Sequence, residues 1–278
     1  MEVIVLPSPE AVCLRAADIV AGVVKDRPAA VLALPTGNTP RAIYAELVRR
    51  HRDEGLSFAR ATVFNLDEYV GVPPDHPGAF RRAIHEAFVR HVDLPAGRVH
   101  APDGQAADLP AACARYEAEI AAAGGWDLAL LGLGTDGHIA FNEPTSSLGS
   151  RTRVKTLTEE TRVVNQPAFG ADPVPRQAVT VGIATILEAR RCVLVAFGAA
   201  KAAAVAKTVE GPLAALVPAS ALSFTRRRPS SSTRRRPSVC RCALITTRWR
   251  PGNRSALDRL PVAVVKATAA GGLARRRP

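Results

Sequence analysis

The sequence has little that points to a membrane, secreted or metal-binding protein. None of its apolar runs reaches the roughly 18 residues that a membrane-spanning helix needs. The N-terminal stretch MEVIVLPSPE is acidic and starts with a strand-like run, which is not typical of a signal peptide. The five cysteines stand mostly among apolar residues and have no zinc-type spacing. We therefore expect a cytoplasmic protein without disulfides or a zinc site.

Acidic residues are scarce only towards the C-terminus. Of the 37 Lys and Arg residues, 15 lie in residues 225–278, beside a single acid, Asp258. The other 22 basic and 24 acidic residues give residues 1–224 a net charge of −2, although the whole chain carries +12. The composition predicts a folded domain over 1–224, followed by an Arg/Pro/Ser-rich tail over 225–278 that is disordered.

Apolar runs alternate with segments of helical periodicity through residues 1–209. Strands are predicted at 3–6, 30–34, 61–66, 127–131 and 192–197. Helices are predicted at 9–25, from Pro40 to about 52, and at 80–91, 111–123, 179–189 and 199–209. This alternation predicts a single α/β domain with a mostly parallel, doubly wound, Rossmann-like sheet and helices on both faces.

The stretch 130–144, LLGLGTDGHIAFNEP, is the most informative part of the sequence. A buried strand ends in glycines, and Asp136, His138 and Glu143 follow at the edge where open α/β sheets bind ligands. Gly137 allows the loop to turn tightly against a ligand. An imidazole flanked by two acids suits general acid–base chemistry, whereas the alternative is a polar loop with one solvated histidine.

Two further strands end in polar loops. Thr36, Gly37, Asn38 and Thr39 join the strand 30–34 to a helix, an arrangement that can bind an anion on free backbone amides. An ordinary strand–helix turn is the alternative reading. Asp67 follows the strand 61–66, where it is either a catalytic acid or a cap of the loop.

Read together, these loops resemble the glucosamine-6-phosphate deaminase family over residues 1–222. The matching segments are LPTGNTP (34–40), FNLDEYVG (64–71) with DHP (75–77), GTDGHIAFNEPTSSLGSRTRVKTLTEETR (134–162) and VEGPLAALVPASAL (209–222). The related phosphogluconolactonases share the DGH part of the pattern, but a different continuation is expected there in place of the FNEP of residues 141–144.

The resemblance implies an enzyme of amino sugar catabolism, which converts glucosamine 6-phosphate and water to fructose 6-phosphate and ammonia without a metal or cofactor. It implies that Asp136, His138 and Glu143 open the sugar ring and that Asp67 moves a proton from C2 to C1. The substrate phosphate is then expected on the loop of Thr36, Gly37, Asn38 and Thr39, with Gly137 nearby and Lys201 as its counter-charge.

Some members of the family are hexamers regulated by N-acetylglucosamine 6-phosphate at subunit contacts. The residues of this chain on the matching segment are Ser146, Ser147, Arg153, Lys155 and Thr156. The resemblance therefore implies a regulatory site in a homo-oligomer, and a solvated basic strand edge is the alternative.

The chain departs from the family first at Pro167. The family has an arginine that holds the substrate phosphate after Asn165, where this chain reads Gln166-Pro167-Ala168-Phe169. Loss of one charge-assisted contact costs about 1.5–3 kcal/mol. We therefore expect a weakened phosphate site, unless Arg176 or another base replaces the arginine.

The second departure begins near Leu222, where the resemblance stops. Read one base earlier with GC-rich codons, the following segment yields Leu-His-Pro and then Val-Val-Val-Asp-Glu-Ala-Ala, which is close to the usual continuation of the family. We interpret residues 225–278 as the product of a frameshift in the gene or in its sequencing.

Three alternative functions compete with the deaminase. A sugar-phosphate lactonase or isomerase of related fold is the alternative among enzymes. A nucleic-acid-binding protein would use the arginine-rich tail, but the tail has one Trp and neither Tyr nor Phe beyond Thr225, so no platform for stacking bases is evident. An inactive remnant would follow if the altered C-terminus prevented folding or catalysis.

Overall fold

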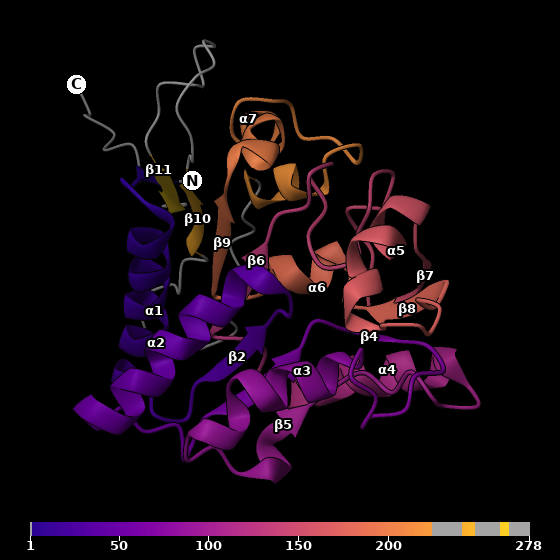
Figure 1. Cartoon of the computed structure of the whole chain (residues 1–278), viewed down its shortest axis with the longest axis horizontal. Coiled ribbons are helices and arrows are strands. Elements are labelled where there is room, and N and C mark those ends of the chain that lie inside the picture. Colours follow the sequence, from indigo (N-terminus) through magenta and orange to yellow (C-terminus); the bar gives the residue numbers. More distant parts are fainter. Residues whose placement is uncertain (1, 224–240, 248–261, 267–278) are drawn as a thin grey trace, which may run out of the picture.

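A mostly parallel eight-stranded sheet forms the centre of the molecule (Figure 1). The computed structural model describes residues 2–223, 241–247 and 262–266. The strands of this sheet, in their order across it, are β1 (Glu2–Val5), β11 (Val262–Lys266), β10 (Arg241–Thr247), β9 (Arg191–Phe197), β6 (Leu128–Gly132), β2 (Val31–Leu34), β3 (Thr62–Asn65) and β5 (Val99–His100). From β10 to β5 every pair of neighbours is parallel.

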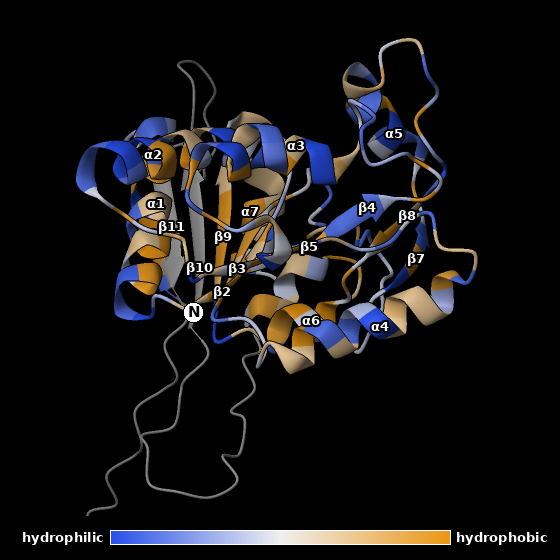
Figure 2. Cartoon of the chain, turned by 90° about the horizontal axis from the view of Figure 1, so that it is seen from below, coloured by the Kyte–Doolittle hydropathy of each residue, from blue (hydrophilic) through white to orange (hydrophobic). Residues whose placement is uncertain are grey.

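Helices cover both faces of this sheet (Figure 2). The α-helices are α1 (Pro9–Asp26), α2 (Asn38–Glu54), α3 (Phe80–Ala87), α4 (Leu109–Ala122), α5 (Glu159–Asn165), α6 (Ile183–Leu187) and α7 (Ala202–Val209). Short 3-10 turns lie at Val89–His91, Ala96–Arg98, Gln166–Ala168, Ala199–Lys201 and Pro218–Ser223.

Alternate residues of the central strands belong to two hydrophobic cores. In β9, Val193 and Val195 pack into the core that α1, α2 and α3 cover, whereas Leu194 and Ala196 pack into the core beneath α4, α6 and α7. Successive side chains of a strand point to opposite faces, so β9 is buried on both sides. The predicted doubly wound α/β sheet is therefore confirmed.

A second, three-stranded sheet lies beside the large one, on the side away from β1 (Figures 1 and 2). Its strands, in order, are β4 (Asp67–Tyr69), β8 (Gln177–Thr180) and β7 (Arg153–Thr156), all antiparallel. The helix predicted at 179–189 is therefore wrong at its start, because Val179 and Thr180 pair with both neighbouring strands. Periodicity does not distinguish such a short apolar run from a helix.

Two segments of the predicted tail are strands of the large sheet. β10 pairs with β9, and both β10 and β11 pair with β1. The structure thus differs from the predicted disordered tail at these segments, whose sequences, RCALITT and VAVVK, are rich in the β-branched residues that favour strands. Residues 224–240, 248–261 and 267–278 lie outside the described residues, and the frameshift stays a prediction.

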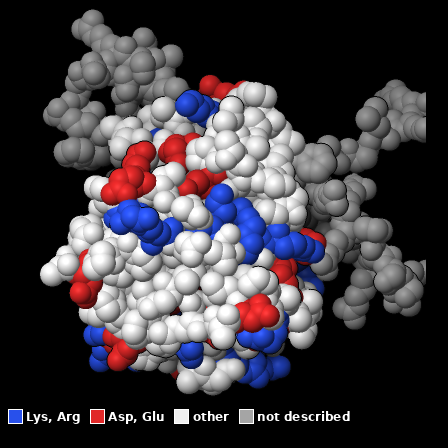
Figure 3. Space-filling model, turned by 90° about the vertical axis from the view of Figure 1, so that its right-hand side faces the viewer, with Lys and Arg blue, Asp and Glu red and all other residues white. Residues whose placement is uncertain are grey.

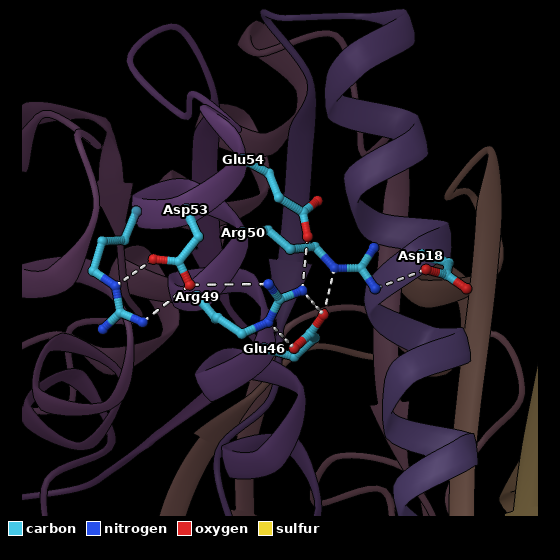
Figure 4. A network of polar contacts seen from close by, with 7 residues as sticks. Asp18, Glu46, Arg49, Arg50, Asp53 and Glu54 are labelled. Carbon is cyan, nitrogen blue, oxygen red and sulfur yellow. Dashed lines mark hydrogen bonds and ion pairs between the residues drawn. The ribbon is translucent and has the colours of Figure 1, made fainter.

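Ion pairs join the outer surfaces of α1 and α2 (Figure 4). Arg50 of α2 reaches Asp18 of α1 at 2.8 Å and Glu46 of its own helix at 2.7 Å. Hydrogen bonds from Arg49 and Arg50 lower the pKa of Glu46 to about 2, against the opposing effect of its partial burial. The pair that joins the two helices, Arg50–Asp18, has an Asp18 side chain that is 48% exposed and contributes less than about 1 kcal/mol, so the hydrophobic contacts of the two helices hold this layer.

Candidate active site

The candidate residues gather at the carboxyl edge of the large sheet. The segments that directly follow β2, β3, β6 and β9 in the chain are 35–39, 66–69, 133–144 and 198–201. Carboxyl ends of parallel strands meet at one edge, where α/β proteins bind their ligands. The structure therefore brings four predicted segments to the same side of the molecule.

Asp136 and His138 form a close pair in the loop after β6. Nδ1 of His138 lies 2.7 Å from Oδ1 of Asp136, which also accepts the backbone N–H of His138 at 3.1 Å. Burial acts to raise the pKa of Asp136, but the contact with His138 outweighs it and the pKa is lowered. The pair therefore consists of an ionised acid that fixes and orients a half-buried imidazole.

Gly134 and Gly137 give this loop its shape. A Cβ atom on Gly134 would lie 2.2 Å from Nδ1 of His138, so the imidazole packs directly over the backbone there. Gly137 has a φ of +92°, which disfavours other residues, and a Cβ on it would lie 2.8 Å from Cγ1 of Val217. The two glycines allow the imidazole and the segment near Val217 to approach the loop.

Glu143 is buried and contacts α5. Its carboxylate accepts hydrogen bonds from the hydroxyl groups of Thr158 at 3.0 Å and Thr161 at 2.6 Å, and from the backbone N–H of Thr158. Thr158 is also the N-cap of α5. The expectation that Glu143 flanks His138 differs from this arrangement, in which the recorded partners of Glu143 are Thr158 and Thr161. Glu143 thus links the loop after β6 to the start of α5.

Asp67 is the first residue of β4 and is 7% exposed. Within the described ranges no hydrogen-bond donor contacts its carboxyl group. Burial and, to a lesser extent, the charge of Glu68 raise the pKa of Asp67 to about 8. Such a pKa suits a group that accepts and returns a proton near neutral pH. The sequence predicted a loop here, whereas the structure has a short strand paired with β8.

The predicted phosphate loop connects β2 to α2. Gly37 has a φ of +105°, and no side chain caps the N-terminus of α2. The first amide groups of an α-helix have no partner within the helix, so they are free to bind an anion. The hydroxyl group of Tyr44 donates to the carbonyl oxygen of Pro35 at 2.6 Å and anchors the loop from beneath.

Lys201 lies at the start of α7, after β9. Partial burial lowers its pKa, against the opposing charges of Asp136 and Glu160. The amino group of Lys201 thus interacts with Asp136 of the loop after β6 and with Glu160. A counter-charge for a phosphate is expected near this loop. Thr135 of the same loop lies 3.5 Å from Glu160 at the start of α5.

The predicted regulatory residues lie in two places. Arg153, Lys155 and Thr156 are in β7, and burial lowers the pKa of Arg153. Ser146, on the turn after Glu143, is buried with no recorded partner for its hydroxyl group, whereas Ser147 is exposed. Figure 3 shows this side of the molecule, where basic side chains form a band. The regulatory role stays a prediction.

A 3-10 turn occupies the position of the missing arginine. Nε2 of Gln166 donates to the carbonyl oxygens of Gly170 and Asp172, which closes the segment on itself. Arg176, considered as a replacement, is exposed on the approach to β8. Neither Gln166 nor Pro167 offers a positive charge, and the weakened phosphate site stays a prediction.

Sequence reasoning missed several polar residues of this region. Asn65 ends β3 with both atoms of its amide buried and without a recorded partner. Thr158 and Thr161 hold Glu143, and Glu68 binds three backbone amides. A signal for Glu68 was available in the adjacent acids of the DEY segment.

In the described part of the chain, no three His, Cys, Asp or Glu side chains gather as metal ligands. None of the helices in this part has the length and apolar character needed to cross a membrane.

Known proteins are similar to this chain in sequence and in fold. Residues 8–230 match the family of glucosamine-6-phosphate isomerases and 6-phosphogluconolactonases. A glucosamine-6-phosphate deaminase of Mycolicibacterium smegmatis is 53% identical over 81% of this chain and 87% of its own, and one of Arthrobacter sp. (strain FB24) is 51% identical over 81% and 86%.

Solved structures agree with these relatives. A structure described as a monomeric glucosamine-6-phosphate deaminase matches with a TM-score of 0.79 and 43% identity, over 81% of this chain and 94% of its own. A 6-phosphogluconolactonase from Thermotoga maritima shares the fold with a TM-score of 0.60 and 21% identity, over 75% and 88%. The chain therefore belongs to the family of glucosamine-6-phosphate isomerases and 6-phosphogluconolactonases.

Proposed function

We propose that the protein is a glucosamine-6-phosphate deaminase, a hydrolase that acts on a C–N bond. The observation that carries this proposal is the buried carboxyl group of Asp67, which no donor contacts in the described residues, at the same sheet edge as the Asp136–His138 pair. One group can move a proton between adjacent carbons while the other moves a proton between oxygens. Curated relatives of about half-identical sequence carry the same name.

Substrate binding begins with the phosphate. The free amides at the start of α2, in the loop of Thr36, Gly37, Asn38 and Thr39, donate hydrogen bonds to its oxygens, and Lys201 supplies a positive charge. Gly137 allows the loop after β6 to approach the sugar. Because Pro167 offers no charge, Lys201 carries more of the phosphate binding here than it would beside an arginine.

Ring opening is assigned to His138. The imidazole takes the proton of the C1 hydroxyl group and delivers a proton to the ring oxygen, while the C1–O5 bond breaks and the C1 aldehyde forms. Asp136 lies against the imidazole and orients the ring, which is a usual role of a carboxylate beside a histidine. Glu143, held by α5, contributes negative charge to the same loop.

Isomerisation and loss of ammonia follow. In its ionised form Asp67 removes the proton from C2 and returns it to C1, while the ammonium group at C2 loses one proton and the aldehyde oxygen gains one. This converts the amino aldehyde through an enolamine into a C2 iminium. Water adds to C2, and ammonia leaves to give fructose 6-phosphate. The raised pKa of Asp67 makes it a stronger base than an exposed aspartate.

The decisive experiment measures ammonia and fructose 6-phosphate released from glucosamine 6-phosphate by the purified 278-residue protein. Hydrolysis of 6-phosphogluconolactone under the same conditions is the comparison, because a lactonase needs no proton transfer at C2. Release of both products from the amino sugar supports the deaminase. Hydrolysis of the lactone without release of ammonia would contradict the deaminase and support a lactonase instead.

If the 278-residue protein releases no ammonia, a second protein is tested, in which the shifted reading frame after Leu222 is restored. Activity of that protein alone would assign the defect to residues 225–278. A folded, restored protein that releases no ammonia would contradict the deaminase.

Assembly, regulation and cellular placement are further parts of the proposal. A homo-oligomer regulated through Ser146, Ser147, Arg153, Lys155 and Thr156 would sediment as a hexamer and respond to N-acetylglucosamine 6-phosphate. The relative of 43% identity is described as monomeric, and a monomer that ignores this ligand would remove regulation from the proposal. Placement in the cytoplasm agrees with a phosphorylated sugar as substrate.

A further inference from the structure

Glu68 is a second buried acid beside Asp67. It is 5% exposed, and its carboxylate accepts three backbone N–H groups. Oε1 accepts from Tyr69 at 2.9 Å and from Phe80 at 3.0 Å, and Oε2 accepts from Arg81 at 2.8 Å. Three amide donors stabilise the ionised form of a carboxyl group.

These contacts make Glu68 the cap of a helix in another part of the chain. Phe80 and Arg81 are the first residues of α3, and the N-cap residue, Ala79, provides no side-chain hydrogen bond. A carboxylate at a helix N-terminus satisfies free amides and interacts favourably with the helix dipole. Glu68 therefore ties β4 to α3.

The backbone of Asp67 is fixed by two independent sets of contacts. β4 pairs with β8, in which Thr180 lies opposite Asp67 and Val179 opposite Glu68. Successive side chains of a strand point to opposite sides. While Glu68 turns to α3, the carboxyl group of Asp67 turns away from that helix.

The two acids have opposite surroundings. Burial raises the pKa of Glu68 above its ordinary value, and its amide partners and Arg81 counteract part of this effect. Burial and the charge of Glu68 both raise the pKa of Asp67. The other titratable groups that interact with Asp67 are Tyr69 and Tyr116, which are neutral at pH 7. Of the two acids, Glu68 is the one with backbone amide donors, which stabilise the ionised form of a carboxyl group.

We propose that Glu68 is a positioning residue for Asp67: its ionised carboxylate, fixed by the amides at the start of α3, holds β4 in place and keeps a negative charge beside the Asp67 carboxyl group. The inference rests on the proposed deaminase function, in which Asp67 is the base. A neighbouring negative charge strengthens a base, so Glu68 contributes to the reaction without contacting the substrate.

The test removes the charge of the Glu68 side chain and keeps its shape. In the full chain, Glu68→Gln retains an oxygen for the amides of Tyr69 and Phe80. We expect the acid limb of the pH profile of kcat/KM, which reports the free enzyme, to move to lower pH. We also expect kcat to fall about tenfold while KM stays within about twofold, because a weaker base slows proton transfer. Glu86→Gln, an exposed site on α3, is the matched control and changes neither value.

A second readout does not depend on turnover. The carboxyl signal of Asp67, assigned by its loss in Asp67→Asn, is titrated by carbon-13 NMR in the wild-type and Glu68→Gln proteins. The pKa of Asp67 is expected to fall in the variant. A folded Glu68→Gln protein with an unmoved acid limb and an unmoved Asp67 titration would overturn the inference.

Glu68→Asp separates charge from contact. It keeps the charge but withdraws it from the amides of Phe80 and Arg81, so thermal stability falls while the pKa of Asp67 stays raised. An ordinary Asp67 titration in this variant would overturn the inference, and this test decides if Glu68→Gln does not fold. A wild-type protein that releases no ammonia would overturn the proposed function alone, because the NMR titration does not need activity.

Discussion

Two buried aspartates, Asp127 before the amino end of β6 and Asp67 just beyond the carboxyl end of β3, show how differently the protein treats a negative charge. At the amino ends of the strands, Asp127 is 7% exposed and binds Arg27 at 2.6 Å, Arg190, and the backbone N–H of Val31 at 2.8 Å. At the carboxyl ends, Asp67 is equally buried but has no recorded donor and lies next to a second acid.

The different surroundings of the two aspartates indicate a structural role for Asp127 and a chemical role for Asp67. Asp127 joins the starts of β2, β6 and β9, and its charge is compensated by two guanidinium groups. The charge of Asp67 is costly because no donor or cation among the described residues compensates it, and buried groups of this kind concentrate at functional sites. An acid of the first kind contributes to stability, and an acid of the second kind reduces stability in return for reactivity.

Asp67→Asn is expected to have the largest effect on activity. It removes the base but keeps the size of the side chain, so kcat falls by about 10²–10⁴-fold. Ammonia release from glucosamine 6-phosphate measures the loss. Asp127→Asn, at the other end of the sheet, is the matched control and leaves kcat within about twofold. Equal losses of kcat in both variants would contradict the distinction between Asp67 and Asp127.

His138→Gln is expected to rank second. The amide can still donate a hydrogen bond but cannot carry a proton, so ring opening loses its catalyst and kcat falls about 10²-fold. Substrate supplied in the open-chain form would recover part of the rate, because that form bypasses ring opening. Full activity of the variant on the closed ring would remove His138 from the mechanism.

Lys201→Met is expected to act mainly on binding. Removal of the cation costs about 1.5–3 kcal/mol, so KM rises about tenfold to a hundredfold. Steady-state kinetics measures the split between KM and kcat. Arg176→Met is the control at the exposed base near β8. If this control raised KM instead, Arg176 would be the replacement for the missing arginine.

Asp127→Asn is expected to have the smallest effect on catalysis and a measurable effect on stability. The variant weakens the pairs with Arg27 and Arg190, and the free energy of unfolding falls by about 1–3 kcal/mol. Urea denaturation checks this value. A variant as stable as the wild type would show that these contacts do not hold the strand ends together.

The sequence predicted most of the large sheet because its strands are short apolar runs with loops of Gly, Pro and Thr between them. It did not predict the sheet of β4, β8 and β7, since Asp67–Tyr69 has no apolar alternation and Gln177–Thr180 runs directly into a helix. Such strands are determined by tertiary pairing, not by local pattern.

The candidate site was predicted to a similar degree. Asp136 and His138 are two residues apart, and in the structure a tight glycine loop places their side chains 2.7 Å from each other. Contacts across long separations could not be read from spacing. Glu143 binds Thr158 and Thr161, and Glu68 binds the start of α3, because loops and helices from different parts of the chain converge there.

The most direct test of the contrast between the two aspartates is the unfolding temperature of the wild-type and Asp67→Asn proteins at pH 5 and pH 8. Because the pKa of Asp67 in the folded protein, about 8, lies above its unfolded value, the folded state binds more protons between these limits and wild-type stability falls as pH rises. The account predicts that Asp67→Asn is the more stable protein at pH 8, with a smaller advantage at pH 5. A difference that is the same at both pH values would contradict it.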